Sequence, residues 1–270
     1  MRCITRHTGY ESRSDVFRLY CITDVHLGNL GSNEGLLKEL AKKIEADPFA
    51  YWIGLGDYCD FINLHDPRFD PRELASWLMG GEELADIGRA EVRRFVDIMR
   101  PVADKCLGLC EGNHESKFLQ HSEADVYAAI VDGLQSTDAH RLDHRGFISW
   151  RFSRQGGSTW TLRILASHGS GGGSSKGNAA NKAGKLAEMA DGVDVILMGH
   201  LHAPSHTPIS KLRPGRTKAE RTTIHTVSCP ALCGDMKYAD DKDLPAMPVG
   251  YAMLQIRPND KQVDVTISVS

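Results

Sequence analysis

Short apolar runs alternate with helix-like stretches along most of the chain, and this alternation limits the choice of fold more than any other feature. Amphipathic periodicity predicts helices at residues 33–46, 82–99 and 179–190, with Asn33 as the cap of the first. From about residue 222 the helical pattern ends and strand-like segments follow one another. This order favours a βαβ-rich α/β domain with a second sheet packed on the first. The apolar runs are residues 17–23, 51–55, 106–110, 159–166, 193–198, 223–227 and 251–256.

The length of the chain fits one large domain. Of its 270 residues, 41% are hydrophobic and 25% are charged, which is ordinary globular composition. We predict a single domain over residues 1–270, in which residues 61–105 form either a helical insert that caps a site or extended crossover helices. The Gly/Ser-rich stretch at 167–178 lies between a strand and a helix, so we interpret it as a loop inside the domain.

Net charge and the lack of long apolar segments limit the partners. The formal net charge is −3, so no overall positive field would draw the protein to nucleic acid or to an acidic membrane. No segment approaches the ~20 apolar residues of a membrane span, and the polar amino terminus has no apolar signal region. We expect no membrane partner and a cytoplasmic location.

The cysteines indicate thiols rather than a disulfide framework. There are seven of them, an odd number, and several fall in apolar runs, as expected for buried thiols in a reducing compartment. Cys106/Cys110 and Cys229/Cys233 share a spacing that raises the question of structural zinc. The first pair sits inside an apparent strand and the second flanks Pro230, so zinc is the disfavoured alternative.

Five of the apolar runs end in Asp, Asn or His, and α/β proteins build their sites at the carboxyl ends of strands. Carboxylate, imidazole and amide groups together suit borderline divalent metals such as Mn, Fe or Zn. Asp57 is central in the set and could bridge two ions, and metals ~3.5–4 Å apart can clamp a phosphoryl oxygen. Any one pair alone would be a turn or a satisfied histidine, but five in order are not expected by chance. The residues are Asp24, His26, Asp57, Asp60, Asn113, His114, His168, His200 and His202.

These blocks resemble the signature of the calcineurin-like metallophosphoesterase superfamily, which is DxH, GDxxD, GNH followed by Asp or Glu, a lone His-Gly, and GHxH. Here they read DVH at 24–26, GDYCD at 56–60, GNHE at 112–115, HG at 168–169 and GHLH at 199–202. The match spans residues 24–202. The resemblance implies an α/β fold of two packed mixed β-sheets flanked by helices, arranged as a four-layer sandwich.

The resemblance also implies two divalent metal ions, with Mn favoured over Fe or Zn, and a bridging hydroxide that attacks phosphorus. His114 is then not a ligand; it holds the phosphate and protonates the leaving alkoxide, which is typically worth about 10²–10⁴-fold. Asp60 is expected to hydrogen-bond His114, fix its tautomer and raise its pKa. One metal would be held by Asp24, His26, Asp57 and His202, and the other by Asp57, Asn113, His168 and His200.

Differences from three known branches of this family count against the substrates of those branches. Protein Ser/Thr phosphatases carry an arginine after the second Asp of GDxxD and another before GNHE, and those positions here are Phe61 and Glu111. Bacterial UDP-diacylglucosamine pyrophosphohydrolases share the DxHL opening, but this chain has no strongly apolar insert suited to acyl chains. DNA-repair nucleases share DxHLG and GNH, and the net charge of −3 counts against them.

We therefore predict a metal-dependent phosphoesterase, favoured as a phosphodiesterase or nuclease. A small-molecule phosphomonoesterase or nucleotide pyrophosphatase is the enzymatic alternative, and an inactive binding scaffold is the non-enzymatic one, although no ligand position is lost. Two segments could bind a phosphate ester or nucleic acid: the basic stretch 210–221, with Arg213 and Arg216, and the stretch 170–176, with Lys176. A solvated hairpin and a flexible loop are the alternatives, and the oligomeric state is left open.

Overall fold

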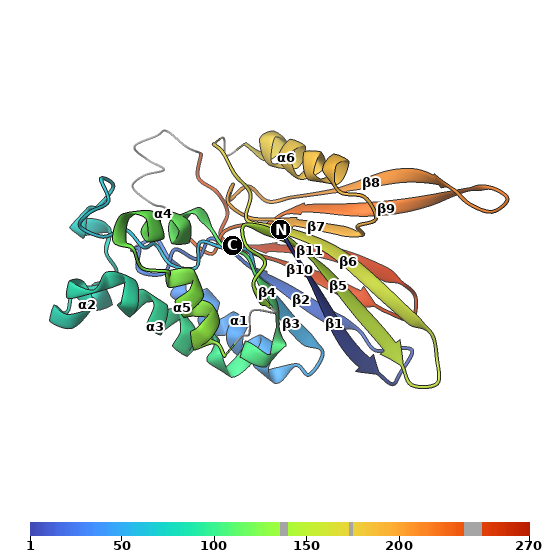
Figure 1. The fold of residues 1–270 in the computed structure, drawn as a ribbon, viewed down its shortest axis with the longest axis horizontal. Helices are drawn as coiled ribbons and strands as arrows, with labels where there is room; N and C mark the ends of the chain where they lie inside the picture. Colours follow the sequence, from blue (N-terminus) through green and yellow to red (C-terminus); the bar gives the residue numbers. More distant parts are fainter. Residues whose placement is uncertain (136–139, 173–174, 235–244) are drawn as a thin grey trace.

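Two mixed β-sheets form the centre of the protein (Figure 1). The computed structural model describes residues 1–135, 140–172, 175–234 and 245–270, apart from the side chains of Lys176 and Arg213. The six-stranded sheet has the order β1 (Arg2–Tyr10), β5 (Arg145–Arg154), β6 (Thr159–Ser167), β7 (Val195–Met198), β9 (Ala219–Ser228) and β8 (Ser205–Pro214). The five-stranded sheet has the order β11 (Gln262–Val269), β10 (Gly250–Arg257), β2 (Phe17–Ile22), β3 (Ala50–Gly54) and β4 (Cys106–Leu109).

Helices cover the outer faces of both sheets, which gives four layers and confirms the predicted fold class (Figure 1). Buried side chains from both sheets, among them Ile53 and Trp150, form the core between them. None of the helices in the described ranges has the length and apolar character needed to cross a membrane. On the five-stranded sheet lie α1 (Glu34–Ala46), α3 (Ile87–Met99) and α5 (Val126–Gly133), and on the six-stranded sheet lies α6 (Lys176–Met189). The other helical segments are η1 (Pro71–Glu73), η2 (Ser76–Leu78), α2 (Gly81–Ala85), η3 (Arg100–Lys105) and α4 (Asn113–Ser122).

The strand-rich carboxyl end does not form the second sheet by itself, contrary to the expectation from the sequence. β10 pairs with β2, with Ala252 opposite Cys21, whereas β9 pairs with β7 in the other sheet. Each sheet thus combines early and late strands. The sequence pattern of a strand determines which of its faces is buried, but it does not select the neighbouring strand.

Local side-chain caps explain where two of the helices begin. The Asn33 side chain accepts a hydrogen bond from the backbone N–H of Leu36, so it caps α1 as predicted. The Asp86 side chain accepts from the backbone N–H of Arg89 and starts α3. The single helix predicted over 82–99 is therefore divided into α2 and α3.

Parallel strands bring distant parts of the sequence to one end of the fold. β2, β3 and β4 are parallel neighbours, with Ile22 opposite Gly54 and Gly54 opposite Leu109. In the other sheet, β6 and β7 are parallel neighbours, with Ser167 opposite Met198. The turns that follow these five strands therefore lie close together, where the carboxyl ends of the parallel strands of both sheets meet.

The turns that carry the predicted site adopt an unfavourable backbone conformation. A non-glycine residue in the left-handed region costs roughly 1–2 kcal/mol. Such strain persists only where surrounding contacts hold it, and it concentrates at functional sites. The φ angles are +49° at Asp24, +45° at His26, +53° at Asp57, +70° at His200 and +54° at His202.

The carboxylate of Glu115 fastens two of these turns to each other. Its Oε2 accepts hydrogen bonds from the backbone N–H groups of Asp57 (3.0 Å) and Gly112 (2.9 Å), and its Oε1 accepts from that of Tyr58 (2.8 Å). The side chain is buried, and burial together with the nearby Asp57 carboxylate raises the pKa of Glu115 to about 7. One side chain thus links the turn after β3 to the turn after β4.

Replacement of Glu115 by alanine should destabilise the protein. Three buried N–H groups would lose their acceptor, and each unsatisfied group costs about 1–3 kcal/mol. We expect the free energy of unfolding, measured by urea titration, to fall by at least ~2 kcal/mol. Lys117→Ala, at an exposed position of the same helix, is the control and should change it by less than ~0.5 kcal/mol. Equal stability of Glu115→Ala and wild type would mean that other contacts hold the turns.

Candidate metal centre

Asp57 lies at the centre of the converging strand ends. Its Oδ2 is 3.3 Å from Nε2 of His168 and 3.9 Å from Nε2 of His26. Its Oδ1 accepts a hydrogen bond of 2.9 Å from the backbone N–H of His114. The Asp57 side chain is buried, so these protein groups form much of its surroundings.

Asp24 joins the two sheets at the other side of the cluster. Its carboxylate accepts hydrogen bonds from the Thr23 hydroxyl (2.6 Å) and from the backbone N–H of His200 (2.8 Å). Oδ1 of Asp24 also lies 3.3 Å from Nε2 of His202. The structure therefore brings together all the predicted ligand side chains, which are Asp24, His26, Asp57, Asn113, His168, His200 and His202.

His168 is held in one tautomer. Its Nδ1 lies 2.8 Å from the carbonyl oxygen of Leu55, so Nδ1–H donates there. Its Nε2 is left facing two oxygens, Oδ1 of Asn113 at 3.0 Å and Oδ2 of Asp57 at 3.3 Å. A nitrogen lone pair directed at two acceptor oxygens is favourable only when a cation or a proton lies among them.

His26 shows the same arrangement. Its Nδ1 is 3.2 Å from Oδ1 of Asp60, and Oδ2 of Asp60 accepts a hydrogen bond of 3.1 Å from Asn29. The opposite atom, Nε2 of His26, is buried without a hydrogen-bond partner. A carboxylate that orients one ring nitrogen so that the other faces inward is typical of metal-binding histidines.

The electrostatics of the cluster favour bound positive charge. Burial alone would raise the pKa of Asp57, but the surrounding imidazoles outweigh it and hold this pKa well below its usual range. Burial lowers the pKa of His168, yet the Asp57 carboxylate prevails and raises it to about 9. The pKa of His26 also rises to about 9, because Cys233, Asp60 and Asp57 together outweigh burial. A divalent cation could replace the protons that these imidazoles hold.

Three overlapping groups of side chains meet the spacing of a metal site. The ligand atoms of each group lie within 4.8 Å of one another, and Asp57 belongs to two of the groups. Together with the unpartnered Nε2 of His26, this donor set fits divalent metal ions. The groups are His26, Asp57 and His114; Asp57, His168 and His200; and His26, His202 and Cys233.

The expected pairing of Asp60 with His114 takes a different form. The carboxylate of Asp60 binds His26 and Asn29, whereas Nδ1 of His114 lies 2.5 Å from the backbone carbonyl oxygen of Asp60. The Asp60 carboxylate is farther away, at 3.6 Å from the same nitrogen. Burial is the largest influence on His114 and its pKa is lowered, not raised. The tautomer is still fixed, but by the main chain.

Arg68 reaches this centre from the predicted insert. Its guanidinium forms two hydrogen bonds to the carboxylate of Asp66, of 3.0 and 2.7 Å, and its Nη1 lies 3.5 Å from Nε2 of His114. Residues 61–70 thus extend to the strand ends, whereas α3 packs beside α1 and α5. The sequence places Arg68 in the segment 61–105, predicted to be a cap or extended crossover helices, but it does not indicate which residue of that segment contacts the centre.

Glu115 and Cys233 were also not predicted to belong to this region. Glu115 is part of the GNHE block, but its role in holding two turns depends on backbone groups that a motif does not display. The sequence pairs Cys233 only with Cys229, in the disfavoured zinc alternative. In the structure both thiols are free, and Cys233 instead lies 3.8 Å from Nδ1 of His202.

The predicted substrate residues are not brought to the centre where the structure describes them. Arg216 is exposed in the turn between β8 and β9. The hairpin is paired from Ser205 to Pro214, which is about 30 Å of extended strand. Its near end follows His202, so the basic turn lies at the far tip of an arm (Figure 1). The side chains of Lys176 and Arg213 lie outside the described part of the structure.

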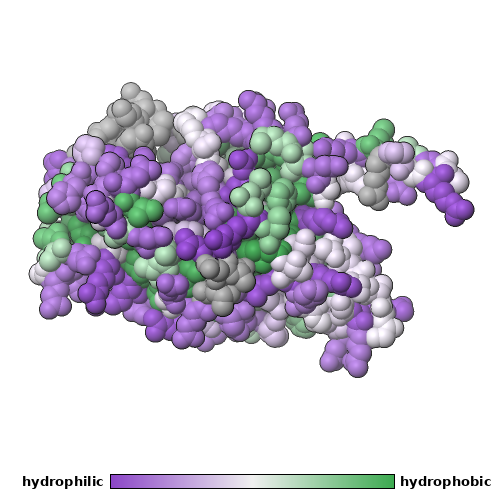
Figure 2. All heavy atoms as spheres, viewed as in Figure 1, coloured by the Kyte–Doolittle hydropathy of each residue, from purple (hydrophilic) through white to green (hydrophobic). Residues whose placement is uncertain are grey.

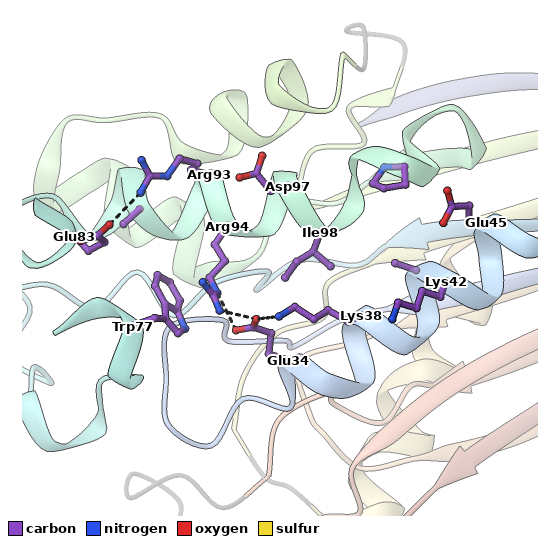
Figure 3. Close-up of a pocket in the computed structure, with 13 residues that line it drawn as sticks. Glu34, Lys38, Lys42, Glu45, Trp77, Glu83, Arg93, Arg94, Asp97 and Ile98 are labelled. Carbon is purple, nitrogen blue, oxygen red and sulfur yellow. Dashed lines mark hydrogen bonds and ion pairs between the residues drawn. The ribbon is translucent and has the colours of Figure 1, made fainter. Parts of the chain in front are cut away.

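A separate surface pocket lies between α1 and α3 (Figure 3). Several of its charged side chains bind one another: Arg94 makes two hydrogen bonds with Glu34 and lies 4.4 Å from the centre of the Trp77 ring. It contains none of the predicted ligands. The pocket is therefore not the metal centre.

Comparisons with solved structures give likenesses of low identity. A conserved uncharacterized protein of Streptococcus pneumoniae, described as a predicted phosphoesterase, has 11% identity and a TM-score of 0.39, covering 95% of this chain and 99% of that chain. The NAD nucleotidase of Haemophilus influenzae has 12% identity and a TM-score of 0.41, with coverage of 93% and 49%. The calcineurin-like phosphoesterase YfkN of Bacillus subtilis has 12% identity and a TM-score of 0.37, with coverage of 94% and 90%.

Comparisons of the sequence itself are more specific. No curated protein matches the chain. The model of the family described as calcineurin-like phosphoesterase matches residues 17–204, which is more than half of the chain and includes all five blocks from Asp24 to His202. The chain therefore belongs to the calcineurin-like phosphoesterase family.

Proposed function

We propose that the protein is a dinuclear metal-dependent phosphoesterase that acts as a phosphodiesterase or nuclease. The observation that carries this proposal is the buried Asp57 carboxylate, which belongs to two of the three candidate ligand groups. A carboxylate in that position can serve two ions at once. The free thiols of the chain support a reducing, cytoplasmic location.

The seven ligand side chains divide into two sets around Asp57. We assign Asp24, His26 and His202 to one ion, in line with the contacts of His202 with Asp24 and His26. We assign Asn113, His168 and His200 to the other, in line with the contacts of His168 with Asn113 and His200. Carboxylate, imidazole and amide donors suit Mn, Fe or Zn, and Mn is proposed here. When bound, two such ions would polarise the phosphoryl oxygens and stabilise the charge that develops on them.

His114 is proposed to act on the leaving group. Its Nδ1–H donates to the carbonyl oxygen of Asp60, so Nε2 is the atom available to substrate. Burial lowers the pKa of this imidazole, whereas the negative charge of a bound phosphate would favour its protonated form. A proton at Nε2 could then pass to the departing alkoxide oxygen.

Arg68 is proposed to hold a phosphate oxygen beside His114. The bond to Asp66 fixes the guanidinium, and Nη1 remains directed toward the ring of His114. A phosphodiester carries one negative charge, whereas a phosphomonoester carries up to two. Protein Ser/Thr phosphatases have two guanidinium groups at this place, whereas this site has one, so it is better suited to the singly charged diester. We propose that residues 61–70 cap the centre in this way.

A substrate screen tests the proposed activity. Purified protein loaded with Mn²⁺ should contain about two ions per chain and should hydrolyse bis-p-nitrophenyl phosphate faster than p-nitrophenyl phosphate. Cyclic nucleotides, dinucleotide pyrophosphates and single-stranded DNA would then separate a phosphodiesterase from a pyrophosphatase and a nuclease. Metal binding without hydrolysis of any of these would favour a binding scaffold.

Two substitutions should separate metal binding from catalysis. Asp57→Asn removes the shared carboxylate charge and should abolish metal loading and hydrolysis together. His114→Ala should keep the metal content, measured by elemental analysis, and lower kcat by at least about 100-fold, as expected for a lost acid. Unchanged turnover in His114→Ala would exclude this residue from the reaction.

Arg68→Ala should weaken the handling of phosphate with little effect on metal content. We expect kcat/KM for the diester to fall by about 10–100-fold, the size of one charge-assisted hydrogen bond of ~1.5–3 kcal/mol. Arg72→Ala is a closely matched control, because Arg72 makes the same two-bond contact with Asp70 at an exposed position. Equal losses in the two variants would assign the effect to the loop and not to a phosphate contact.

A further inference from the structure

Cys233 lies inside the metal centre although none of the family blocks contains it. Its side chain is 3% exposed, and its Sγ is 3.8 Å from Nδ1 of His202. The ligand atoms of His26, His202 and Cys233 lie within 4.8 Å of one another. Two ligands at ~2.3 Å (sulfur) and ~2.05 Å (nitrogen) from one tetrahedral ion are about 3.6 Å apart, close to the observed separation.

The main chain holds Cys233 in this place. After β9, the backbone N–H of Leu232 donates to the carbonyl oxygen of Asp24 (3.2 Å), and the carbonyl oxygen of Leu232 accepts from Asn33 (2.9 Å). The N–H of Gly234 donates to the carbonyl oxygen of Gly31 (2.9 Å). The segment that carries Cys233 is thus attached on both sides to the chain that follows the Asp24 turn.

A second observation points to a bound cation at the same position. His26 is 3% exposed, its Nδ1 is occupied by Asp60, and its Nε2 is buried without a hydrogen-bond partner. A buried polar nitrogen without a partner is costly. An ion held between Nε2 of His26, Nδ1 of His202 and Sγ of Cys233 would satisfy this nitrogen and explain the position of the thiol. In this set His202 binds through Nδ1, and its Nε2 faces Oδ1 of Asp24 at 3.3 Å.

We propose that Cys233 is a thiolate ligand of the metal held by His26 and His202, so that the two metal positions are chemically unequal. This inference rests on the proposed function. Thiolate ligands select Zn²⁺ and Fe over the harder Mn²⁺. The other position, with Asn113, His168 and His200, has only oxygen and nitrogen donors. When a softer ion is available, it would therefore displace Mn²⁺ on the Cys233 side, while Mn²⁺ would remain on the other.

Cobalt spectroscopy tests this ligand directly. Full-length protein loaded with Co²⁺ should show a sulfur-to-cobalt charge-transfer band in the near ultraviolet. Cys233→Ser and Cys233→Ala should lose the band. Their Zn²⁺ affinity, measured by competition with a chelator, should fall at least about tenfold, because even the mutation of a residue that only orients a ligand lowers metal affinity by about 10–100-fold. Cys3→Ser, which removes an exposed thiol, and Cys229→Ser, in the same segment as Cys233, should both keep the band.

The outcomes separate this inference from the proposed function. Wild-type protein that binds two Co²⁺ ions and hydrolyses the diester without a near-ultraviolet sulfur band would overturn the thiolate ligand and leave the phosphoesterase intact. A band that persists in Cys233→Ser would assign it to another cysteine and would also overturn the inference. Failure to bind Co²⁺ at all would contradict both proposals. An absent band in the wild-type spectrum overturns the inference even when a variant does not fold, and a present band is assigned to Cys233 by its loss in whichever of Cys233→Ser and Cys233→Ala folds.

Discussion

The buried carboxylate of Asp57 is the constraint on which the rest of the structure depends. The side chain is buried, and its Oδ2 lies close to imidazoles that follow strands of both sheets. Burying charge in this way is expensive unless it is paired. The carboxylates and imidazoles therefore compensate one another, and a set so arranged has a strong preference for positive charge. The ends of β2, β3, β4, β6 and β7 are organised around that preference.

The cluster requires a strained main chain at the turns, and contacts with the surrounding fold keep the chain in that conformation. Left-handed φ angles at the turn residues would relax in a free peptide. Glu115 restrains two of the turns through three backbone N–H groups, and Asp24 accepts the N–H of His200 from the opposite sheet. The core between the sheets fixes the strand ends themselves (Figure 2 shows the mostly hydrophilic face that encloses it). Rigidity at the centre thus comes partly from Glu115, which is outside the proposed ligand set, and partly from Asp24, which belongs to it.

Much of this arrangement could be predicted from the sequence because the relevant signals are local. Each strand end carries its own Asp, Asn or His, and the spacing inside each block is fixed by one turn. Contacts between distant segments were not accessible in the same way. Arg68 lies 46 positions from His114, and the partner of Asp60 was wrongly expected to be His114 because the sequence cannot rank two nearby imidazoles. Strand β1 was missed because it is a half-exposed edge strand without an apolar run.

The hairpin of β8 and β9 extends far from the strand ends that form the centre. Charges on its tip are about 30 Å from the strand ends, and screening in physiological salt acts within about 8 Å. A small ester bound at the strand ends would therefore have no appreciable electrostatic interaction with Arg216. Only a ligand about as long as the hairpin could contact both the tip and the strand ends.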